Sequence, residues 1–252
     1  MPLLTKADLP HVPFADTILK IFSVDKVNRL YDSAADKKGA DFAQKFLKNA
    51  GINYTIENEE ILDRLPDGPF VTVSNHPFGS VDGLMLLDIF GHRYPEFKIM
   101  VNRFLMRIRA AEDSFIPVTP EGRDHPDPKE NIPGIKEVIR NIREGNPVGF
   151  FPSGAVSDSK GIGRHTVIQD RPWQESVIRL IKKLDVPVVP VQFLDHNSRW
   201  FYFLGHIGWG LRISRLPHEI INKRGKTLRV RLWEPTGADQ LCEIEKAFVS
   251  RL

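Results

Sequence analysis

The sequence predicts an α/β fold: a mixed, largely parallel sheet flanked by helices, with a helical N-terminal lead-in. Short apolar runs rich in β-branched residues alternate along the chain with longer segments whose apolar residues recur at helical spacing. The order strand, helix, strand, helix favours parallel strands joined by helical crossovers. A chain of 252 residues with 41% hydrophobic residues is long enough to bury a large core.

The N-terminal part of the chain is predicted to be mainly helical. Residues 14–31 and 35–49 each place apolar side chains at near-helical spacing. A short strand is expected over residues 52–57. We therefore predict a helical lead-in over residues 1–58 and an α/β domain over residues 59–252, together forming one compact unit.

The turn LPDGP, residues 65–69, is expected to precede the first strand of the α/β domain's sheet. Apolar or alternating runs predict its strands, at residues 70–75, 98–102, 116–120, 148–152, 186–194 and 227–235. Helical spacing predicts its helices, at residues 83–90, 134–144, 173–185 and 238–250, and polar stretches predict loops at 122–133 and 155–171. Pro187 and Pro190 predict that the strand over 186–194 lies at an edge or an irregular place in the sheet.

Charge and composition limit the classes of partner. The formal net charge is +3, a mild excess that fits an anionic partner, and no basic run with interleaved aromatic residues of the nucleic-acid-binding type is present. A single cysteine, Cys242, allows no intrachain disulfide. The chain shows neither a signal peptide nor a transmembrane run, so we expect a cytoplasmic protein whose membrane contact is peripheral.

A histidine and a carboxylate follow the predicted strand 70–75, in the segment VTVSNHPFGSVDG. Ligands gather at the carboxyl ends of strands in open α/β sheets, and a histidine is the natural general base near neutral pH. His76 works best if a carboxylate holds its second ring nitrogen, and Asp82 is the nearest candidate. In a regular helix the two would point apart, so they meet only if the backbone around Pro77 and Gly79 is not plain helix.

A structural role for these two residues stays open from the spacing alone. A lone His-Pro pair usually serves a loop, and Asp82 can simply cap the following helix. Other catalytic patterns are missing: Ser80 and Ser153 lack the glycine two residues before that a nucleophile elbow needs, and no HExxH or cysteine pair suggests a metal. What remains is a base without a built-in nucleophile, which favours direct activation of a substrate hydroxyl or amine.

Four stretches of the sequence resemble conserved blocks of a known protein family. The stretch SNHPFGSVDG resembles the first sequence block of the glycerolipid acyltransferases, the lysophosphatidate acyltransferase-like superfamily, and most closely the bacterial branch of lyso-ornithine-lipid acyltransferases and proteins described as hemolysins. FFPSGAVSDS resembles the third block, VPVVPVQF the fourth, and NSRWFYFLGHIGWGLR the tail typical of this branch. The resemblance covers roughly residues 65–235.

The resemblance implies an O-acyltransferase without a metal or other cofactor. In such enzymes the histidine, here His76, takes the proton of an acceptor hydroxyl, and the aspartate, here Asp82, orients it. The hydroxyl attacks the thioester of an acyl carrier protein or coenzyme A, with no covalent acyl-enzyme. The superfamily has four residues between the two, whereas this chain has five, an HxxxxxD spacing that the closer branch shares.

The third block also departs from the superfamily pattern, which reads Phe-Pro-Glu-Gly with an arginine soon after. Here Ser153 replaces the glutamate, and Ala155-Val156 follow Gly154. The resemblance associates the charged positions with the acceptor's phosphate, so the acceptor is expected to be an aminolipid or another hydroxylated monoacyl lipid. The turn at Ser153-Gly154 is expected to offer backbone N–H groups to the acceptor or to the developing oxyanion.

Further substrate-binding positions are predicted around these blocks. Asn75 and Gly79 flank the histidine, and Arg103 falls where the second block belongs, either as a clamp for an anionic group or as a surface charge. Weaker candidates lie in the loop after the third block: Lys160, Arg164 and Arg171. Asp170 and Trp173 resemble the pattern of the branch. Asp170 also fits a helix cap, and Trp173 also fits a helix anchor.

Membrane contact follows from a monoacyl acceptor, which partitions into bilayers. The expected place is the inner face of the membrane. Residues 14–26, with four large apolar side chains and two lysines, can form an interfacial helix, and WFYFLGHIGWG over residues 200–210 can line an acyl tunnel or lie at the interface. Both stretches also fit core packing. Two other functions stay open: a thioester or ester hydrolase, and a lipid-binding protein without turnover.

Overall fold

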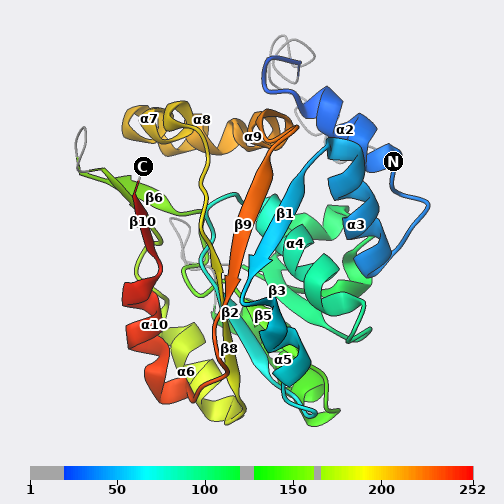
Figure 1. Ribbon diagram of the computed structural model, residues 1–252, viewed down its shortest axis with the longest axis vertical. Helices are drawn as coiled ribbons and strands as arrows, with labels where there is room; N and C mark the ends of the chain where they lie inside the picture. The colour runs from blue at the N-terminus through cyan, green and yellow to red at the C-terminus, as the bar shows by residue number, and fades with distance from the viewer. Residues whose placement is uncertain (1–19, 120–127, 162–165, 252) are drawn as a thin grey trace.

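A seven-stranded sheet forms the centre of the computed structural model, which describes residues 20–119, 128–161 and 166–251 (Figure 1). The strand order is β1-β9-β8-β2-β5-β3-β4, and every neighbouring pair is parallel except β8 and β9. The strand bounds are β1 Asn53–Glu57, β2 Val71–Ser74, β3 Lys98–Asn102, β4 Phe115–Val118, β5 Val148–Phe150, β8 Val188–Phe193 and β9 Thr227–Leu232. The predicted mixed, largely parallel α/β fold is confirmed.

Helices cover both faces of the sheet, because successive strand residues point to opposite sides. On one face α3 (Gly39–Ala50) and α4 (Ser80–Gly91) join a core that includes Val189 and Val191 of β8. On the other face α5 (Ile132–Arg143), α6 (Glu175–Leu184) and α10 (Leu241–Ala247) pack over a second core, which includes Val188.

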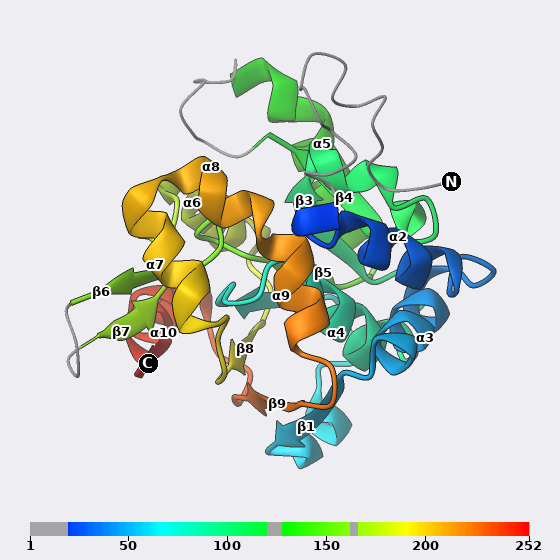
Figure 2. The ribbon, with the colours of Figure 1, turned by 90° about the horizontal axis from the view of Figure 1, so that it is seen from above.

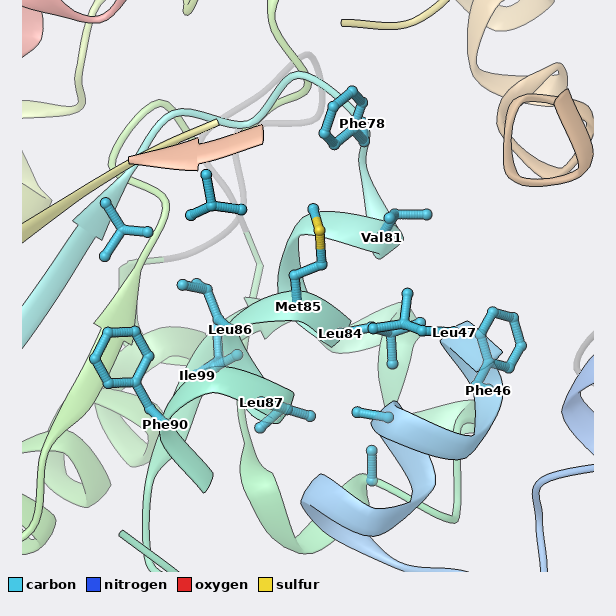
Figure 3. Packing of buried hydrophobic residues seen from close by; sticks show 14 of the residues in the cluster. Phe46, Leu47, Phe78, Val81, Leu84, Met85, Leu86, Leu87, Phe90 and Ile99 are labelled. Atoms are coloured by element: carbon cyan, nitrogen blue, oxygen red, sulfur yellow. The ribbon is translucent and has the colours of Figure 1, made fainter. Parts of the chain in front are cut away.

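Helix α4 carries the deepest packing of the first core. Its side chains reach Ile99 of the sheet on one side and Phe46 and Leu47 of α3 on the other (Figure 3). The helix begins at Ser80, three residues before the predicted start. The Asp82 carboxylate accepts the backbone N–H groups of Phe78 and Gly79, which closes a first turn that apolar spacing does not reveal.

The predicted helix over 14–31 is interrupted in its described part. Ser23 has a φ of 62°, a left-handed conformation that breaks helical geometry, and α2 runs from Val24 to Asp32 after it. Of the apolar residues expected to mark an interfacial helix, Phe14 and Ile18 lie outside the described residues.

Strand β8 lies inside the sheet, so of the two places predicted from its prolines the edge is wrong and the irregular place is confirmed. Pro187 precedes the strand, and its carbonyl accepts the Val71 N–H at 2.9 Å. Pro190 falls just outside the ladder with β9, which starts at Val191. A proline in a central strand is tolerated here because its missing N–H lies where the pairing with β9 is interrupted, while its carbonyl accepts the Trp233 N–H at 3.1 Å.

The C-terminal helix predicted over 238–250 is shorter than expected. A 3-10 turn (Ala238–Gln240) leads into α10, and β10 (Val249–Arg251) follows as a strand. It pairs antiparallel with β7 (Val167–Gln169), which pairs with β6 (Asp158–Lys160). This second sheet occupies part of the predicted polar loop, because three-residue polar strands give no periodic signal.

Three helices fill the connection between β8 and β9: α7 (Arg199–Ile207), α8 (Trp209–Ser214) and α9 (Leu216–Asn222). They lie across one end of the molecule, and α9 contacts α2 (Figures 1 and 2). β2 and β8 run parallel and β8 ends at Phe193, so these helices stand at the carboxyl edge of the sheet, the edge at which β2 also ends. This places them next to the loop that follows β2.

Candidate active site

His76 and Asp82 lie in contact just past the carboxyl end of β2. The Nδ1 atom of His76 is 2.8 Å from an Asp82 carboxylate oxygen. The chain turns between them at Gly79, whose φ of 89° and ψ of −120° favour glycine, and α4 then brings its third residue, Asp82, back toward the ring. The structure therefore provides the departure from plain helix that contact between these two side chains requires.

The Asp82 carboxylate is fully buried. Burial raises its pKa, while the neighbouring His76 ring and the N–H groups of Phe78 and Gly79 act in the opposite direction by stabilising the charge. Those two N–H groups each lie 3.0 Å from the carboxylate. Held in this way, the carboxylate lies beside Nδ1 of the His76 ring, an arrangement that can orient a histidine so that its Nε2 acts as a base.

The backbone of His76 is held on both sides. Its N–H donates to Asp170 at 3.1 Å, and its carbonyl accepts the Ser157 N–H at 2.9 Å. The Ser157 hydroxyl in turn donates to the same Asp170 carboxylate. The His76 ring lies against Phe151, with 4.3 Å between ring centroids. We refer to Ser157 and Asp170 as the backbone clamp, since they hold the turn that carries His76 from a different segment.

Asp170 does not cap a helix, although a cap is one of the roles that its sequence position fits. The N-cap of α6 is Gln174, four residues later, whereas the Asp170 side chain is buried next to the turn that carries His76. Burial raises the pKa of this carboxyl to about 6, against the bonds from Ser157 and His76. Trp173, in contrast, is buried in the second core against Phe248, as expected for a helix anchor.

An apolar cavity of about 250 Å³ adjoins the His76 ring. Its walls come from α4, β3, β4, β5, α5 and α6, and the described lining residues are His76, Gly79, Ser80, Gly83, Leu84, Met100, Val101, Asn102, Leu105, Ile108, Phe115, Val118, Thr119, Asn131, Ile135, Phe150, Phe151, Gly154, Gln174, Ser176, Val177 and Leu180. Among these described residues there is no lysine, arginine, aspartate or glutamate. The cavity suits a hydrocarbon chain better than a charged group.

The turn at Ser153-Gly154 uses one of its backbone donors within the protein. The Gly154 N–H donates to the Phe151 carbonyl at 3.0 Å, and a role for this turn in binding the acceptor or an oxyanion stays a prediction. The Ser153 side chain is buried, and its hydroxyl donates to the Ala155 carbonyl at 2.9 Å. Gly154 still lines the cavity, with a φ of 63°, and a Cβ there would lie 2.1 Å from the Gln174 amide nitrogen.

The remaining predicted site residues lie in different surroundings. The Asn75 side chain pairs with the Phe193 backbone, accepting its N–H at 2.8 Å and donating to its carbonyl at 2.9 Å, which ties the ends of β2 and β8 together. Arg103 is exposed past the end of β3, is absent from the cavity wall, and donates to the Glu130 carbonyl at 3.4 Å. Lys160 and Arg171 are exposed as well, and Arg164 lies outside the described residues. A substrate-binding role for Asn75 and Arg103 stays a prediction.

Comparisons with known proteins indicate the family of the chain. Residues 10–248 match the family described as Acyltransferase. The chain is 28% identical over 223 residues to the lyso-glycine lipid O-acyltransferase of Bacteroides thetaiotaomicron, covering 86% of this chain and 78% of that protein. It is 28% identical over 222 residues to the protein of the same name from Phocaeicola vulgatus, covering 84% and 74%.

A solved structure shares the fold. The 1-acyl-sn-glycerophosphate (LPA) acyltransferase PlsC from Thermotoga maritima superposes with a TM-score of 0.52 at 14% identity, over 93% of this chain and 85% of that chain. The resemblance to the glycerolipid acyltransferase superfamily is confirmed. With a family match that spans nearly its whole length, the chain belongs to the acyltransferase family and is an acyltransferase.

Proposed function

We propose that this chain transfers a fatty acyl group from an acyl thioester to the hydroxyl of a monoacyl lipid. The thioester is that of an acyl carrier protein or coenzyme A. The observation that carries the proposal is the pairing of His76 with a buried carboxylate beside an apolar cavity large enough for part of an acyl chain. Contact with a membrane surface belongs to the same proposal, since both the acceptor and the product are lipids.

His76 acts as a general base in this mechanism. Its Nε2 atom takes the proton of the acceptor hydroxyl while the oxygen attacks the thioester carbonyl carbon. Asp82 stabilises the imidazolium that forms. When the tetrahedral intermediate collapses, the carbon–sulfur bond breaks, and the proton on His76 passes to the leaving thiolate. An ester and a thiol are the products, and His76 returns to its neutral form.

An acceptor without a phosphate fits the third block best. Ser153 stands where the superfamily carries a glutamate, and its hydroxyl is engaged by the Ala155 carbonyl. The described cavity wall holds no cation for a phosphate. The two curated relatives are named for a lyso-glycine lipid, an aminolipid. A monoacylated glycine lipid is therefore the first acceptor to test.

The test is thiol release from an acyl thioester, supplied as coenzyme A or carrier-protein forms, against a panel of acceptors. The panel holds monoacylated glycine lipid, lyso-ornithine lipid and lysophosphatidate. Release that requires one acceptor supports the proposal and identifies the substrate. Release at the same rate without any acceptor would instead show a hydrolase.

Filling the cavity is expected to change the acyl chains that the enzyme accepts. Gly83 lines the cavity from α4, and a Cβ built on it meets no atom within 4 Å. Gly83→Phe therefore extends into the cavity and is expected to lower transfer of a hexadecanoyl group by about tenfold or more relative to an octanoyl group. Competition between the two thioesters measures this ratio.

Gly83→Ala is the matched control, because it changes the same helix position while adding one methyl group. Its chain-length ratio is expected to stay close to that of the wild type. An unchanged ratio in Gly83→Phe, in protein that folds normally, would show that the acyl chain lies elsewhere.

A further inference from the structure

Large exposed apolar side chains gather at the edge of the sheet that carries His76. Nine are exposed in the described part of the chain, and five of them lie on α7 and α8. Phe104 follows the end of β3, Ile132 lies in the connection after β4, and α7 follows β8. Because β3, β4 and β8 all run in the direction of β2, these connections start at the same carboxyl edge.

Helices α7 and α8 are built with an inner and an outer face. Phe201 and Tyr202 are buried in a small core with Leu216, whereas Trp200 and Phe203 are half exposed and stack on each other with 5.1 Å between ring centroids. Exposed Ile207, Trp209 and Leu211 continue the outer face. We call this outer face of α7 and α8 the aromatic face.

Buried polar contacts on the inner side of α7 and α8 hold these helices in position, and with them the aromatic face. The Ser198 hydroxyl accepts the Phe201 N–H at the start of α7 and donates to Glu219 of α9. Arg212 of α8 is buried and donates to Asp158 at 2.7 Å. A rigid helix pair that turns its large aromatic rings outward needs a partner surface for them.

Charge indicates which kind of partner. No aspartate or glutamate occurs between Asp195 and Glu219, the segment that holds the aromatic face. None occurs between Glu96 and Glu112 either, the segment that holds Phe104. Both segments contain arginines, among them exposed Arg103, Arg107 and Arg199. An exposed aromatic surface on a segment that carries arginines and has no carboxylate of its own is complementary to an anionic lipid surface.

We propose that the aromatic face and the neighbouring arginines dock this edge of the protein on an anionic bilayer. Trp200, Phe203 and Trp209 enter the headgroup region, where amphipathic aromatic rings are favoured. None of the helices in the described part of the chain is both long and apolar enough to span a bilayer, so the contact is interfacial. The inference rests on the proposed function, because only a lipid substrate requires a membrane.

The core beneath the aromatic face reaches the turn that carries His76. Leu216, which belongs to the core beneath α7 and α8, lies 3.2 Å from the position that a Cβ of Gly79 would take. Gly79 lies between His76 and Asp82. The helices that carry the aromatic face are therefore packed next to the turn that holds His76 and Asp82.

Vesicle flotation of the full chain tests the proposal. Vesicles of phosphatidylcholine alone are compared with vesicles of phosphatidylcholine and phosphatidylglycerol in equal parts. The wild type is expected to float with the anionic vesicles, and the double variant Trp200→Ser, Phe203→Ser is expected to bind them about tenfold or more weakly. Val249→Ser, which removes an exposed apolar side chain from β10, is the control and is expected to float like the wild type.

Two charge-reversal variants measure how much electrostatic attraction contributes to vesicle binding. Arg199→Glu is expected to weaken binding to the anionic vesicles, whereas Lys182→Glu, at the exposed end of α6 on the opposite edge of the sheet, is expected to leave it unchanged. Equal binding by all variants, or no flotation of the wild type, would overturn the proposal. So would a concentration-dependent dimer that the double variant loses, since the aromatic face would then be covered by a second copy.

A transfer assay with the acceptor dissolved in detergent measures catalysis in the absence of a bilayer, and so tests the proposed function separately from membrane docking. The double variant is expected to retain its rate in detergent and to lose rate only with acceptor held in vesicles. Absence of transfer by the wild type in detergent would contradict the proposed function and leave the flotation result to be judged on its own.

Discussion

Replacing His76 with alanine is expected to lower acyl transfer by about 10²–10⁴-fold, the usual contribution of a general base. The fold is expected to remain, because the backbone clamp holds His76 through its main-chain N–H and carbonyl, which the substitution keeps. Initial rates of acceptor-dependent thiol release measure the loss, and chemical unfolding measures the stability.

The same chain offers a second histidine–aspartate contact as a control. His92 lies 3.3 Å from Asp88 at the other end of α4 and does not line the cavity. His92→Ala is expected to transfer acyl groups at nearly the wild-type rate. If His76→Ala kept more than about a tenth of that rate, His76 would not be the base.

Asp170→Asn is expected to change how stability depends on pH. The folded protein raises the pKa of this carboxyl to about 6, above its ordinary value of 3.8. As pH rises, Asp170 therefore loses its proton first in the unfolded chain, and the free energy of unfolding falls between pH 3.8 and about pH 6. The fall is at most about 3 kcal/mol. An asparagine does not titrate, and its oxygen still accepts from His76 and Ser157.

Urea unfolding at pH 4 and pH 7 measures the effect as a difference between the variant and the wild type. The variant should gain stability relative to the wild type on going from the lower to the higher pH. Asp82, whose pKa is also raised, is present in both proteins and cancels in the difference. The exposed Asp67→Asn serves as the control. Parallel curves for Asp170→Asn and wild type would show that Asp170 titrates normally.

The parts of the fold that periodicity encodes were predictable. The strands of the main sheet and the helices on its faces have apolar patterns long enough to be recognised in the sequence. His76 and Asp82 are six residues apart, so their contact is local. The contact between the two side chains depends on a turn with positive φ at residue 79, and the glycine at this position of the sequence indicates such a turn.

Contacts between distant segments were not predictable. Asp170 is 94 residues from His76, and nothing near it in the sequence marks a bond to a backbone N–H. Burial of Pro190 in a central strand depended on a break in pairing with β9, which is visible only in three dimensions. Helices α7 and α8 come from a stretch that is apolar on most sides. Its sequence therefore did not indicate which aromatic side chains are buried and which are exposed.

The pairing of β1 with β9 has a consequence for how the protein is made. β1 is complete when residue 57 leaves the ribosome, but in the main sheet it pairs only with β9, and partners such as Glu57 and Arg231 are 174 residues apart in the chain. At translation rates of about 5–20 residues per second, that strand waits roughly 10–35 s without its neighbour. The nascent chain thus carries an unsatisfied strand through most of its synthesis, and a chain released before residue 227 exposes β1 to pairing with other molecules.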